Sequence, residues 1–262
     1  MATRRRLDTE LVRRGLVSSR AEAQDAIVRG QVLVKGVPAT RAATMVDAEE
    51  SIKLDGPARR FVSRGGEKLD GALDRLGLEV ADRAWLDAGA STGGFTDCLL
   101  QRGARSVVAV DVGYGQLDLR LRNDPRVTVL ERTNVRNLVP SSLPALADGV
   151  VADLSFISLR VVIGALVACA TPDADHVLLV KPQFEAGPDR VGRGGVVRDA
   201  GVWLATMTHV VEAGREHGLG LVGATYSDPP GPAGNREFFL HLRRDGASDA
   251  AVLTTAIKQV AL

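Results

Sequence analysis

Four ionisable residues, widely separated along the chain, have the types and positions that acid–base chemistry requires. Lys68 lies at the start of a helical segment, while Asp153 and Lys181 each end an apolar run. Ligands of open parallel sheets bind outside the carboxyl ends of the strands, so Asp153 and Lys181 are expected at one edge. Glu237 begins the last apolar run, and an antiparallel last strand would place it at the same edge. Two amines and two carboxylates beside one pocket would be groups suited to general acid–base chemistry, and coincidence is then hard to argue.

Each of these residues, taken singly, also fits a solvated surface charge. Lys68 is less easily explained in that way, because it is expected in the first turn of its helix, where the helix dipole disfavours a cation. Packing alone does not account for a lysine there. The convergence of all four residues is therefore what favours a site over scattered charges.

The stretch LDAGASTGGFT, residues 86–96, is a glycine-rich turn between an apolar run and a helical segment. Gly89 to Gly93 fits the G-x-S-x-G turn of serine hydrolases, and it also fits a loop that holds a nucleotide. A hydrolase needs several strands before this turn, whereas here the turn follows the first strand of its domain. The four histidines lie in strand or helix patterns and not in loops: His176, His209, His217 and His241. The nucleotide-binding interpretation is therefore favoured.

The same loop does not fit a dinucleotide, because Ser91 stands where the G-x-G-x-x-G fingerprint needs its second glycine. Asp111 ends the second strand, 24 residues after Asp87, about the distance at which a carboxylate meets a ribose diol. A ligand without a pyrophosphate, such as S-adenosylmethionine, suits this pattern, although Asp111 could simply cap its strand. The residues expected to bind this cofactor are Asp87, Gly89, Ala90, Ser91, Thr92, Gly93, Gly94, Phe95, Asp111, Val112, Asn134 and Asp153.

The elements that must position these residues alternate from residue 65 onward. Apolar strands are predicted at residues 84–88, 106–112, 127–131, 149–153 and 176–181, each followed by a loop or a helix-length segment. A long helix is predicted at about residues 200–217, followed by two strands joined by a Pro/Gly loop, the last one antiparallel. This alternation predicts an α/β domain over residues 65–262, with a doubly wound, Rossmann-like, mostly parallel sheet covered on both faces.

Residues 1–55 have a different pattern, that of a small α+β module. One short helix would be capped by Asp8 or Thr9, and a second would begin at a Ser19–Glu22 capping box and end at Gly30. The segments QVLVKG and SIKLD are predicted to be short strands.

The N-terminal part of the chain is also basic. Residues 1–68 hold 14 Lys/Arg against 9 Asp/Glu, a net charge of +5, and the remainder carries −4. A basic N-terminal region of this kind, called the head below, suggests contact with phosphates, and the alternative is an ordinary solvated surface. Residues 56–64, GPARRFVSR, are predicted to be an Arg-rich linker, and residues 185–199 either a mobile lid that grips RNA or a solvated loop. The residues expected to contact RNA are Arg5, Arg6, Arg13, Arg14, Arg20, Lys35, Arg59, Arg60, Arg64 and Arg193.

These motifs resemble known families. The segment RLDTELVRRGLVSSRAEAQDAIVRGQVLVKG is similar to the S-four-like RNA-binding domain, named after a small-subunit ribosomal protein. DAGASTGGFT, ADLSFISL and VKPQFE, with the four ionisable residues, resemble the Lys-Asp-Lys-Glu pattern of FtsJ-like RNA ribose 2′-O-methyltransferases. Essentially the whole chain is similar to the TlyA family, also called hemolysin A or rRNA (cytidine-2′-O)-methyltransferases. The linker of that family usually carries a tryptophan where this chain has Phe61.

The resemblance implies an S-adenosylmethionine-dependent enzyme that methylates a cytidine ribose in ribosomal RNA of the small subunit, the large subunit or both. Such methylation would affect susceptibility to tuberactinomycin antibiotics. Lys181 would take the proton or steady the alkoxide, and Asp153 and Glu237 would orient it. Lys68 would hold the phosphate of the target nucleotide. From their position alone, the linker residues around Phe61 are expected to couple RNA docking to cofactor binding.

Composition limits the other functions. The chain is 45% hydrophobic and 25% charged, as is ordinary for a soluble globular protein. No apolar stretch approaches the ~20 residues of a membrane-spanning helix, and the N-terminus lacks a secretion signal, so a cytoplasmic protein is expected. Cys98 and Cys169 are expected to be buried thiols, with no metal site, and a monomer is expected. Two other functions stay open: a membrane-active hemolysin, suggested by the family name, and a non-catalytic RNA-binding factor.

Overall fold

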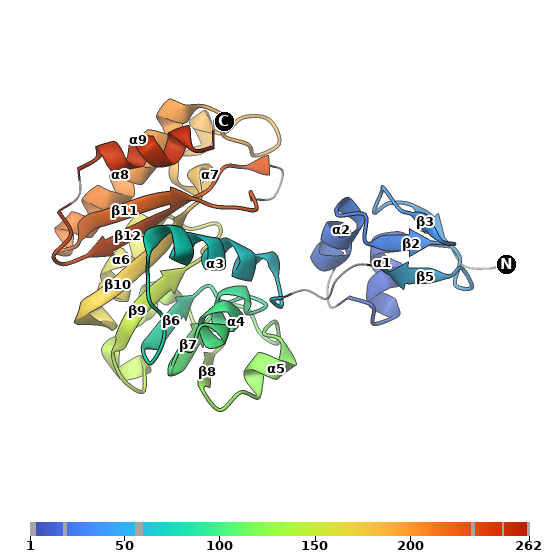
Figure 1. The fold of residues 1–262 in the computed structure, drawn as a ribbon, viewed down its shortest axis with the longest axis horizontal. Coiled ribbons are helices and arrows are strands. Elements are labelled where there is room, and N and C mark those ends of the chain that lie inside the picture. The colour runs from blue at the N-terminus through green and yellow to red at the C-terminus, as the bar shows by residue number, and fades with distance from the viewer. Residues whose placement is uncertain (1–3, 18–19, 56–59, 232–233, 248, 261–262) are drawn as a thin grey trace. The chain divides into compact units, whose positions relative to one another are not determined.

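The computed structural model describes residues 4–17, 20–55, 60–231, 234–247 and 249–260 of the 262-residue chain. It divides into two compact units, Met1–Arg59 and Arg60–Leu262 (Figure 1). This division falls inside the predicted linker. Each unit has a hydrophobic core of its own.

The larger unit is built on a seven-stranded sheet in the order β11-β12-β10-β9-β6-β7-β8. Neighbouring strands from β10 to β8 are parallel, and β12 runs antiparallel to both β10 and β11. The doubly wound sheet and its antiparallel last strand are therefore confirmed. The strands are β6 (Ala84–Ala88), β7 (Ser106–Val110), β8 (Val127–Leu130), β9 (Ala147–Ala152), β10 (Ala170–Val180), β11 (Gly220–Tyr226) and β12 (Phe238–Arg243).

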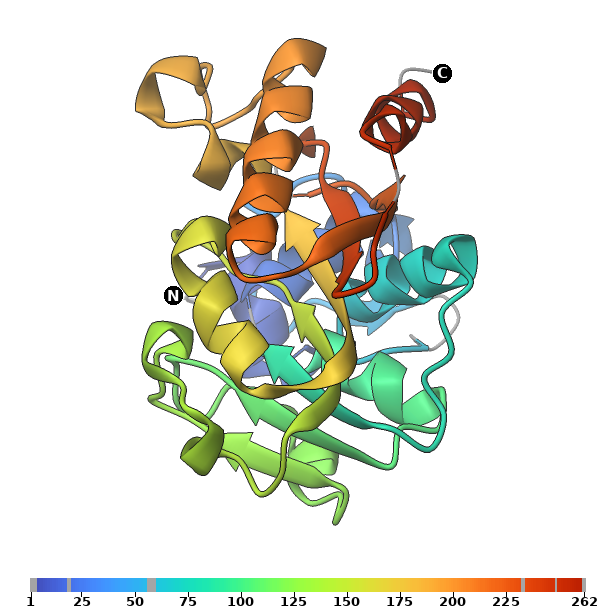
Figure 2. The same cartoon turned by 90° about the vertical axis from the view of Figure 1, so that its left-hand side faces the viewer.

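Helices cover both faces of this sheet (Figures 1 and 2). On one face pack α3 (Arg64–Leu76), α4 (Gly94–Gln101) and α5 (Leu119–Arg122). On the other face pack α6 (Leu159–Ala168), α8 (Ala200–Glu216) and α9 (Ala251–Lys258). Short helical turns lie in the connections: η1 (Val135–Asn137), η2 (Pro140–Ser142), α7 (Pro182–Glu185) and η3 (Pro188–Arg190).

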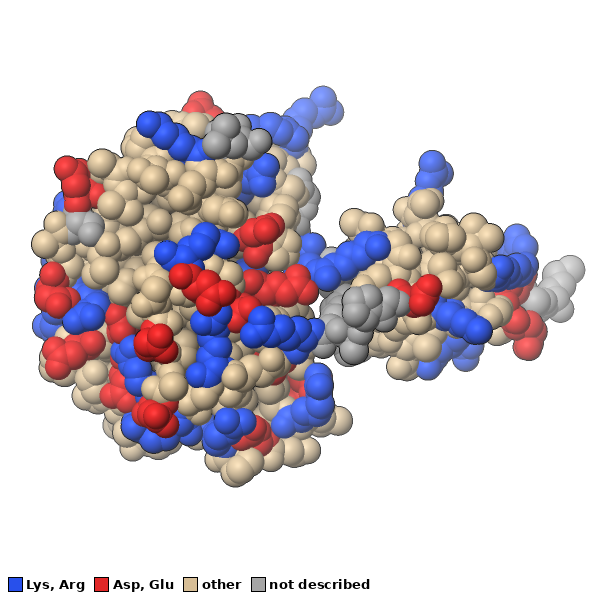
Figure 3. Space-filling view, in the orientation of Figure 1, with Lys and Arg blue, Asp and Glu red and all other residues tan. Residues whose placement is uncertain are grey.

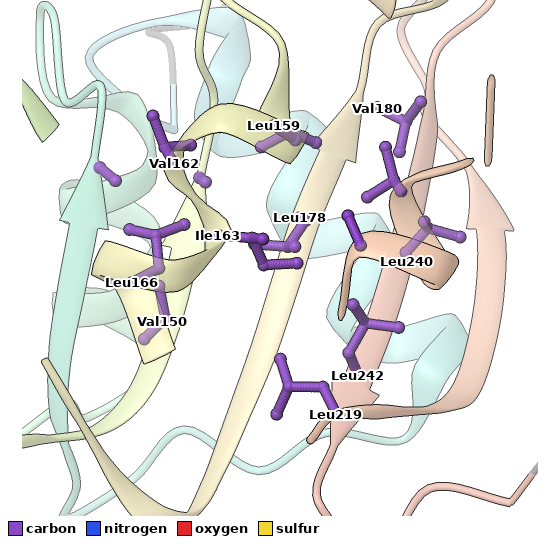
Figure 4. Packing of buried hydrophobic residues seen from close by; sticks show 14 of the residues in the cluster. Val150, Leu159, Val162, Ile163, Leu166, Leu178, Val180, Leu219, Leu240 and Leu242 are labelled. Atoms are coloured by element: carbon purple, nitrogen blue, oxygen red, sulfur yellow. The ribbon is translucent and has the colours of Figure 1, made fainter. Parts of the chain in front are cut away.

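The apolar runs of the strands produce these two layers, because successive side chains of a strand point to opposite faces. On β9, Val150 and Ala152 belong to the core under α6 and α8, whereas Val151 belongs to the core under α3 and α4. Figure 4 shows Ile163 of α6 packed toward Leu178 of β10. Burying one such side chain stabilises the fold by about 1.5–3 kcal/mol, so both layers hold the strand ends firmly.

The smaller unit packs two helices against short strands. β2 lies between β3 and β5 in a three-stranded antiparallel sheet, and β1 pairs with β4. Leu7 and Leu11 share its core with Ile27 and Val32. The elements are β1 (Arg5–Arg6), α1 (Leu7–Arg13), α2 (Arg20–Val28), β2 (Val32–Val34), β3 (Val37–Pro38), β4 (Met45–Val46) and β5 (Ile52–Leu54).

The predicted start of the first helix is wrong. α1 begins at Leu7, with Arg6 at the N-cap, so neither Asp8 nor Thr9 caps it. The Asp8 side chain is instead buried and accepts hydrogen bonds from Arg6 and Arg20. Ser19 of the predicted capping box lies outside the described residues.

The second half of the predicted linker packs on the larger unit. Residues 56–59 lie outside the described part of the chain. Phe61 is buried, and the Val62 N–H donates to Asp97 Oδ2 of α4 at 2.8 Å. Because α3 begins at Arg64, Lys68 stands in its second turn, and the unfavourable position predicted for this lysine at the helix start is wrong.

Candidate active site

Three adjacent strands bring Asp153, Lys181 and Glu237 to one edge of the sheet. Asp153 follows the last residue of β9, and Lys181 follows the last residue of β10. Val180 pairs with Phe238 across β10 and antiparallel β12, so the next positions, Lys181 and Glu237, are neighbours. The end of the sheet where Asp153, Lys181 and Glu237 lie is called the rim below. The fold thus gathers groups that are far apart in sequence.

Lys181 and Asp153 form the more open of two ion pairs at this rim. Lys181 Nζ lies 2.5 Å from Asp153 Oδ1 and donates to Ser155 Oγ at 2.9 Å. The lysine side chain is 11% exposed and the Asp153 side chain 24%. The amine is therefore held by two partners and is still reachable from solvent.

Lys68 and Glu237 form the second pair, which is almost completely buried. Lys68 Nζ donates to Glu237 Oε2 at 2.6 Å, and α3 carries the lysine to this position. Removing one partner of a buried pair leaves an uncompensated charge, which costs about 3–5 kcal/mol. Gln183 Nε2 lies 3.5 Å from Glu237 Oε1, so the segment after Lys181 also reaches this pair.

The glycine loop after β6 lies against the end of β9. Gly89 has φ +88°, and a Cβ at this position would lie 2.5 Å from the carbonyl oxygen of Asp153, so only glycine fits. Asp111, after β7, accepts hydrogen bonds from the N–H groups of Ser91 at 2.8 Å and Gly113 at 2.7 Å. It therefore braces the loop, and its remaining lone pairs can still accept a ribose hydroxyl.

Asp87 is fully buried beneath the same loop. Thr96 Oγ1 donates to its Oδ2 at 2.6 Å, whereas Oδ1 has no hydrogen-bond partner among the described residues. Burial, together with the negative charges of Asp153 and Asp111, raises the pKa of Asp87 to about 7. A buried carboxylate oxygen without a donor is suited to receive one from a ligand.

A hollow beside Asp111 completes this side of the rim. Val112, the residue after Asp111, is exposed and offers an apolar surface. Asp87 can accept a hydrogen bond from an amine of a ligand, and Asp111 can accept from a diol, with the glycine loop between them. These groups fit the S-adenosylmethionine expected from the sequence. The hollow is lined by Ala90, Ser91, Ala109, Asp111, Gly113, Gln116, Leu117, Val129 and Glu131.

The other residues predicted to bind the cofactor have different surroundings. Ala90, Ser91, Thr92 and Gly93 form the loop itself. Gly94 is packed against Ser63, and the Phe95 ring lies in the core 6.0 Å from that of Phe239, so at Phe95 only the backbone can face a ligand. Asn134 accepts a hydrogen bond from the Arg136 N–H and so caps η1.

Sequence reasoning misses several residues at the rim. Ser155 contacts Lys181, and the ring of Phe156 stands 91% exposed beside it, with φ +64°. The Phe156 and Phe184 rings are 5.0 Å apart. Both phenylalanines lie in the motifs ADLSFISL and VKPQFE, so the signal is present, but a phenylalanine pattern alone is also typical of core residues.

Most cations predicted to contact RNA are paired with carboxylates of their own unit. Blue and red side chains lie beside one another on the visible face of each unit (Figure 3). Arg14 also donates to three backbone carbonyls, so it holds the small unit together. Arg5 and Arg64 are half-buried, Arg193 is exposed in the loop after α7, and Arg59 lies outside the described residues. The ion pairs are Arg6–Asp8, Arg20–Asp8, Arg13–Glu10, Arg14–Glu10, Lys35–Glu50 and Arg60–Asp70.

The described residues were also checked for a metal centre, a membrane span and reactive cysteines. Among the described residues, no group of three or more His, Cys, Asp or Glu side chains could hold a metal ion. Within the same residues, no helix has the length and apolar character needed to cross a membrane. Cys98 and Cys169 are free and buried, and burial raises the pKa of the Cys98 thiol to about 12.

Comparison with known proteins gives consistent matches. Residues 61–244 match the FtsJ-like methyltransferase family, and residues 5–52 match the S4 domain. The chain is 53% identical to the 16S/23S rRNA (cytidine-2′-O)-methyltransferase TlyA of Mycobacterium tuberculosis, over 98% of this chain and 97% of the relative. It is 37% identical to Hemolysin A of Brachyspira hyodysenteriae, over 90% of this chain and 98% of that relative. A solved structure described as "Putative hemolysin from Streptococcus thermophilus" is similar to this chain with a TM-score of 0.78 and 35% sequence identity. The match covers 100% of this chain and 98% of the solved one.

Proposed function

The chain belongs to the TlyA family of FtsJ-like methyltransferases, and on that premise we propose that it transfers a methyl group from S-adenosylmethionine to the 2′-hydroxyl of a cytidine ribose in ribosomal RNA. The observation that carries the proposal is the meeting of two ion pairs, Lys181–Asp153 and Lys68–Glu237, at one rim of the sheet. The Mycobacterium tuberculosis relative, similar over nearly the whole chain, supports the substrate class.

Asp87, the glycine loop and Asp111 are the residues that would hold the cofactor. When bound, S-adenosylmethionine supplies a methyl group on a positively charged sulfur, which is already a strong electrophile. Asp87 Oδ1, which lacks a donor, would accept a hydrogen bond from the amine of the ligand. Asp111 would accept from the ribose hydroxyls while it keeps the Ser91 and Gly113 N–H groups in place.

Lys181 is the residue proposed to act on the RNA hydroxyl. A ribose hydroxyl is a poor nucleophile, so a group that takes its proton or steadies the alkoxide contributes about a hundredfold to ten-thousandfold in rate. Asp153 and Ser155 fix the amine, and this fixed position allows the hydroxyl to be held in line with the methyl group. Such alignment contributes roughly 7–11 kcal/mol.

Lys68 has a narrower proposed role than the sequence suggested. Lys68 is buried and its Nζ already donates to Glu237 Oε2 at 2.6 Å, so the structure does not support direct contact with the phosphate of the target nucleotide. We assign it instead to fixing Glu237 and to placing positive charge behind the rim. Glu237 in turn contacts Gln183, two residues after Lys181, and so helps to orient this segment.

RNA would be recognised by the S4 domain and by the rim itself. The small unit matches a domain type whose helices and short strands form a compact surface for folded RNA, which proteins read largely by shape. At the rim, the exposed ring of Phe156 offers a surface on which an unstacked base can lie. Arg193, in the exposed loop after α7, would add a phosphate contact.

The finer features of the proposal follow from the family. We propose a monomer that acts in the cytoplasm on assembled or partly assembled subunits and alters susceptibility to tuberactinomycin antibiotics. Membrane lysis is the competing function, because a relative carries the name hemolysin. No described helix could cross a membrane, and two ion pairs beside a glycine loop have no role in lysis.

The test is a methylation map on both ribosomal subunits. Purified protein, S-adenosylmethionine with a labelled methyl group, and unmodified small and large subunits are incubated separately, and the RNA is analysed by mass spectrometry. The proposal predicts label on a cytidine ribose. Label on a base, or binding of RNA with no transfer at all, would contradict it.

A further inference from the structure

The two loops that carry the Lys181–Asp153 pair are joined a second time, farther from the rim. One loop, residues 153–158, runs from the end of β9 to the start of α6. The other, residues 181–185, runs from the end of β10 through α7. Besides the ion pair, Ser155 contacts Lys181 and the Phe156 ring lies against Phe184.

Glu185 makes the last of these connections. Its side chain accepts a hydrogen bond from Ser158 Oγ at 2.5 Å and another from the Leu159 N–H at 2.7 Å. Arg160 Nε lies 3.6 Å from the same carboxylate. Glu185 is only 6% exposed, so these contacts replace water almost completely.

The partner of Glu185 is a rigid part of the fold. Ser158 and Leu159 form the N-terminus of α6, where backbone N–H groups lack partners within the helix and a negative charge is favourable. Leu159 and Ile163 anchor α6 in the core under the sheet. Burial raises the pKa of Glu185, while its hydrogen bonds from Ser158 and Leu159 favour the charged form.

We propose that Glu185 is a positioning residue for methyl transfer: by clamping the loop after β10 to the start of α6, it holds Lys181 against Asp153 and Ser155. It touches neither of the reacting groups. Without the clamp, the connections that remain between the two loops among the described residues are the ion pair of Lys181 with Asp153, the contact of Lys181 with Ser155 and the ring contact of Phe156 with Phe184. This inference rests on the proposed function.

The experiment compares Glu185→Ala and Glu185→Gln with the wild type and with a control. Alanine removes both hydrogen bonds, whereas glutamine keeps an acceptor for the Leu159 N–H and can donate to Ser158 Oγ. Asp175→Asn is the matched control, because Asp175 is also buried and is held by His241 and Arg83, but lies in the middle of β10, six residues before Lys181. Each variant is titrated with S-adenosylmethionine, so that kcat is calculated per binding-competent molecule.

We expect Glu185→Ala to lower kcat by about tenfold to a hundredfold, the loss typical of a misplacement near 1 Å, with cofactor affinity changed less than about twofold. Glu185→Gln should recover most of kcat, and Asp175→Asn should lose stability without losing kcat. A folded Glu185→Ala with wild-type kcat would overturn the proposal. If that variant does not fold, Ser158→Ala is used, which removes one of the two contacts and also the side-chain cap of α6. It must lower kcat while leaving cofactor affinity unchanged, and an unchanged kcat would overturn the proposal. A wild type that methylates no RNA would instead refute the proposed function.

Discussion

Asp87 is the residue whose environment is hardest to explain by stability. Its carboxylate is fully buried, with one oxygen bonded to Thr96 and the other without a donor. Ionising it there is costly, and its pKa is raised from 3.8 to about 7, first by burial and then by the charges of Asp153 and Asp111. A ligand with a hydrogen-bond donor would supply the partner that Oδ1 lacks. The amine of S-adenosylmethionine would do so.

This explanation predicts that Asp87→Asn stabilises the ligand-free protein and weakens cofactor binding. The folded carboxyl keeps its proton up to pH about 7, whereas the unfolded one loses it near 3.8, so stability falls between these values and stays low above them. At pH 8 the substitution should therefore raise the free energy of unfolding, by on the order of 1–4 kcal/mol. Thermal and urea unfolding measure this.

The same carboxyl should make cofactor affinity depend on pH. Below pH about 7 the ligand-free protein holds the proton, which binding of an ammonium group must displace, so the Kd should rise as pH falls. Calorimetric titration from pH 5.5 to about 7, where the α-amine of the ligand stays protonated, would show this, and Asp87→Asn should be weak and flat over the range. An equal pH dependence in the variant would assign the effect to another group.

Phe156 gives a second prediction at this scale. Replacing its exposed ring by alanine should weaken RNA binding by about 1–3 kcal/mol, the value of one base–aromatic stack, because the ring offers a face on which a base can lie. Leu119→Ala, another exposed apolar side chain of the same unit, is the control. Filter binding with unmodified subunits measures both, and equal losses would argue against stacking.

Residue types alone do not show which side chains lie at the rim. Lys181 and Asp153 can be placed from the sequence because each ends an apolar strand, so topology fixes their edge. Phe156 lies in an irregular loop with positive φ, where no periodic pattern applies. Its ring contact is with Phe184, which comes from a different part of the chain.

At the scale of elements, the glycine loop depends on a close approach between two strand ends. Gly89→Ala should both strain the backbone and force a Cβ within 2.5 Å of the Asp153 carbonyl, displacing the loop. Gly77→Ala, at the end of α3, is the control, since its φ is +64° but a Cβ there meets nothing within 4 Å. The control should cost about 1–2 kcal/mol of stability and leave cofactor binding intact.

Gly89→Ala should lose more stability than the control and, by displacing the loop, at least tenfold in cofactor affinity, a factor worth about 1.4 kcal/mol. Unfolding and calorimetric titration are measured on both variants. Equal cofactor affinity in the two would show that the approach to Asp153 does not shape the site.

Elements whose apolar residues recur in a clear pattern were predictable from the sequence, whereas element boundaries set by tertiary contacts were not. β6 matches its predicted range because AWLDA is an isolated apolar run between polar turns. The start of α3 was missed because Gly65 and Gly66 are poor helix formers. A Cβ at Gly66 would lie 2.4 Å from Phe61 Cβ, so the packing of Phe61 overrides the helix propensity.

At the scale of the whole molecule, the change of pattern near residue 55 predicts two modules, and the structure divides the chain between Arg59 and Arg60. The net charge of the head was a weaker guide to function, because its arginines are largely paired. Asp8 and Glu10 are buried and hold the cations around α1. These pairs first of all stabilise the small unit.

The small unit should therefore lose stability in acid. Hydrogen bonds from Arg13 and then Arg14 lower the pKa of Glu10 to about 2, and those from Arg6 and Arg20 hold the pKa of Asp8 well below its usual range. Their stabilisation is complete above pH about 4.5 and disappears as pH falls toward 2. Amide exchange at Leu7 and Leu11 is measured in the full chain and divided by the intrinsic rate at each pH, and the resulting protection factors should fall over this window as pH is lowered. Glu10→Gln should reduce the change, and pH-independent protection factors would contradict the pairing.

The central claim is that the rim around Lys181 delivers a methyl group to an RNA hydroxyl, and single-turnover methylation by Lys181→Ala tests it most directly. With cofactor and unmodified subunits saturating, the variant should bind S-adenosylmethionine as the wild type does and form 2′-O-methylcytidine about a hundredfold to ten-thousandfold more slowly. Lys258→Ala, on α9, should match the wild type. Formation of the same methylated ribose by Lys181→Ala at the wild-type rate would contradict the account.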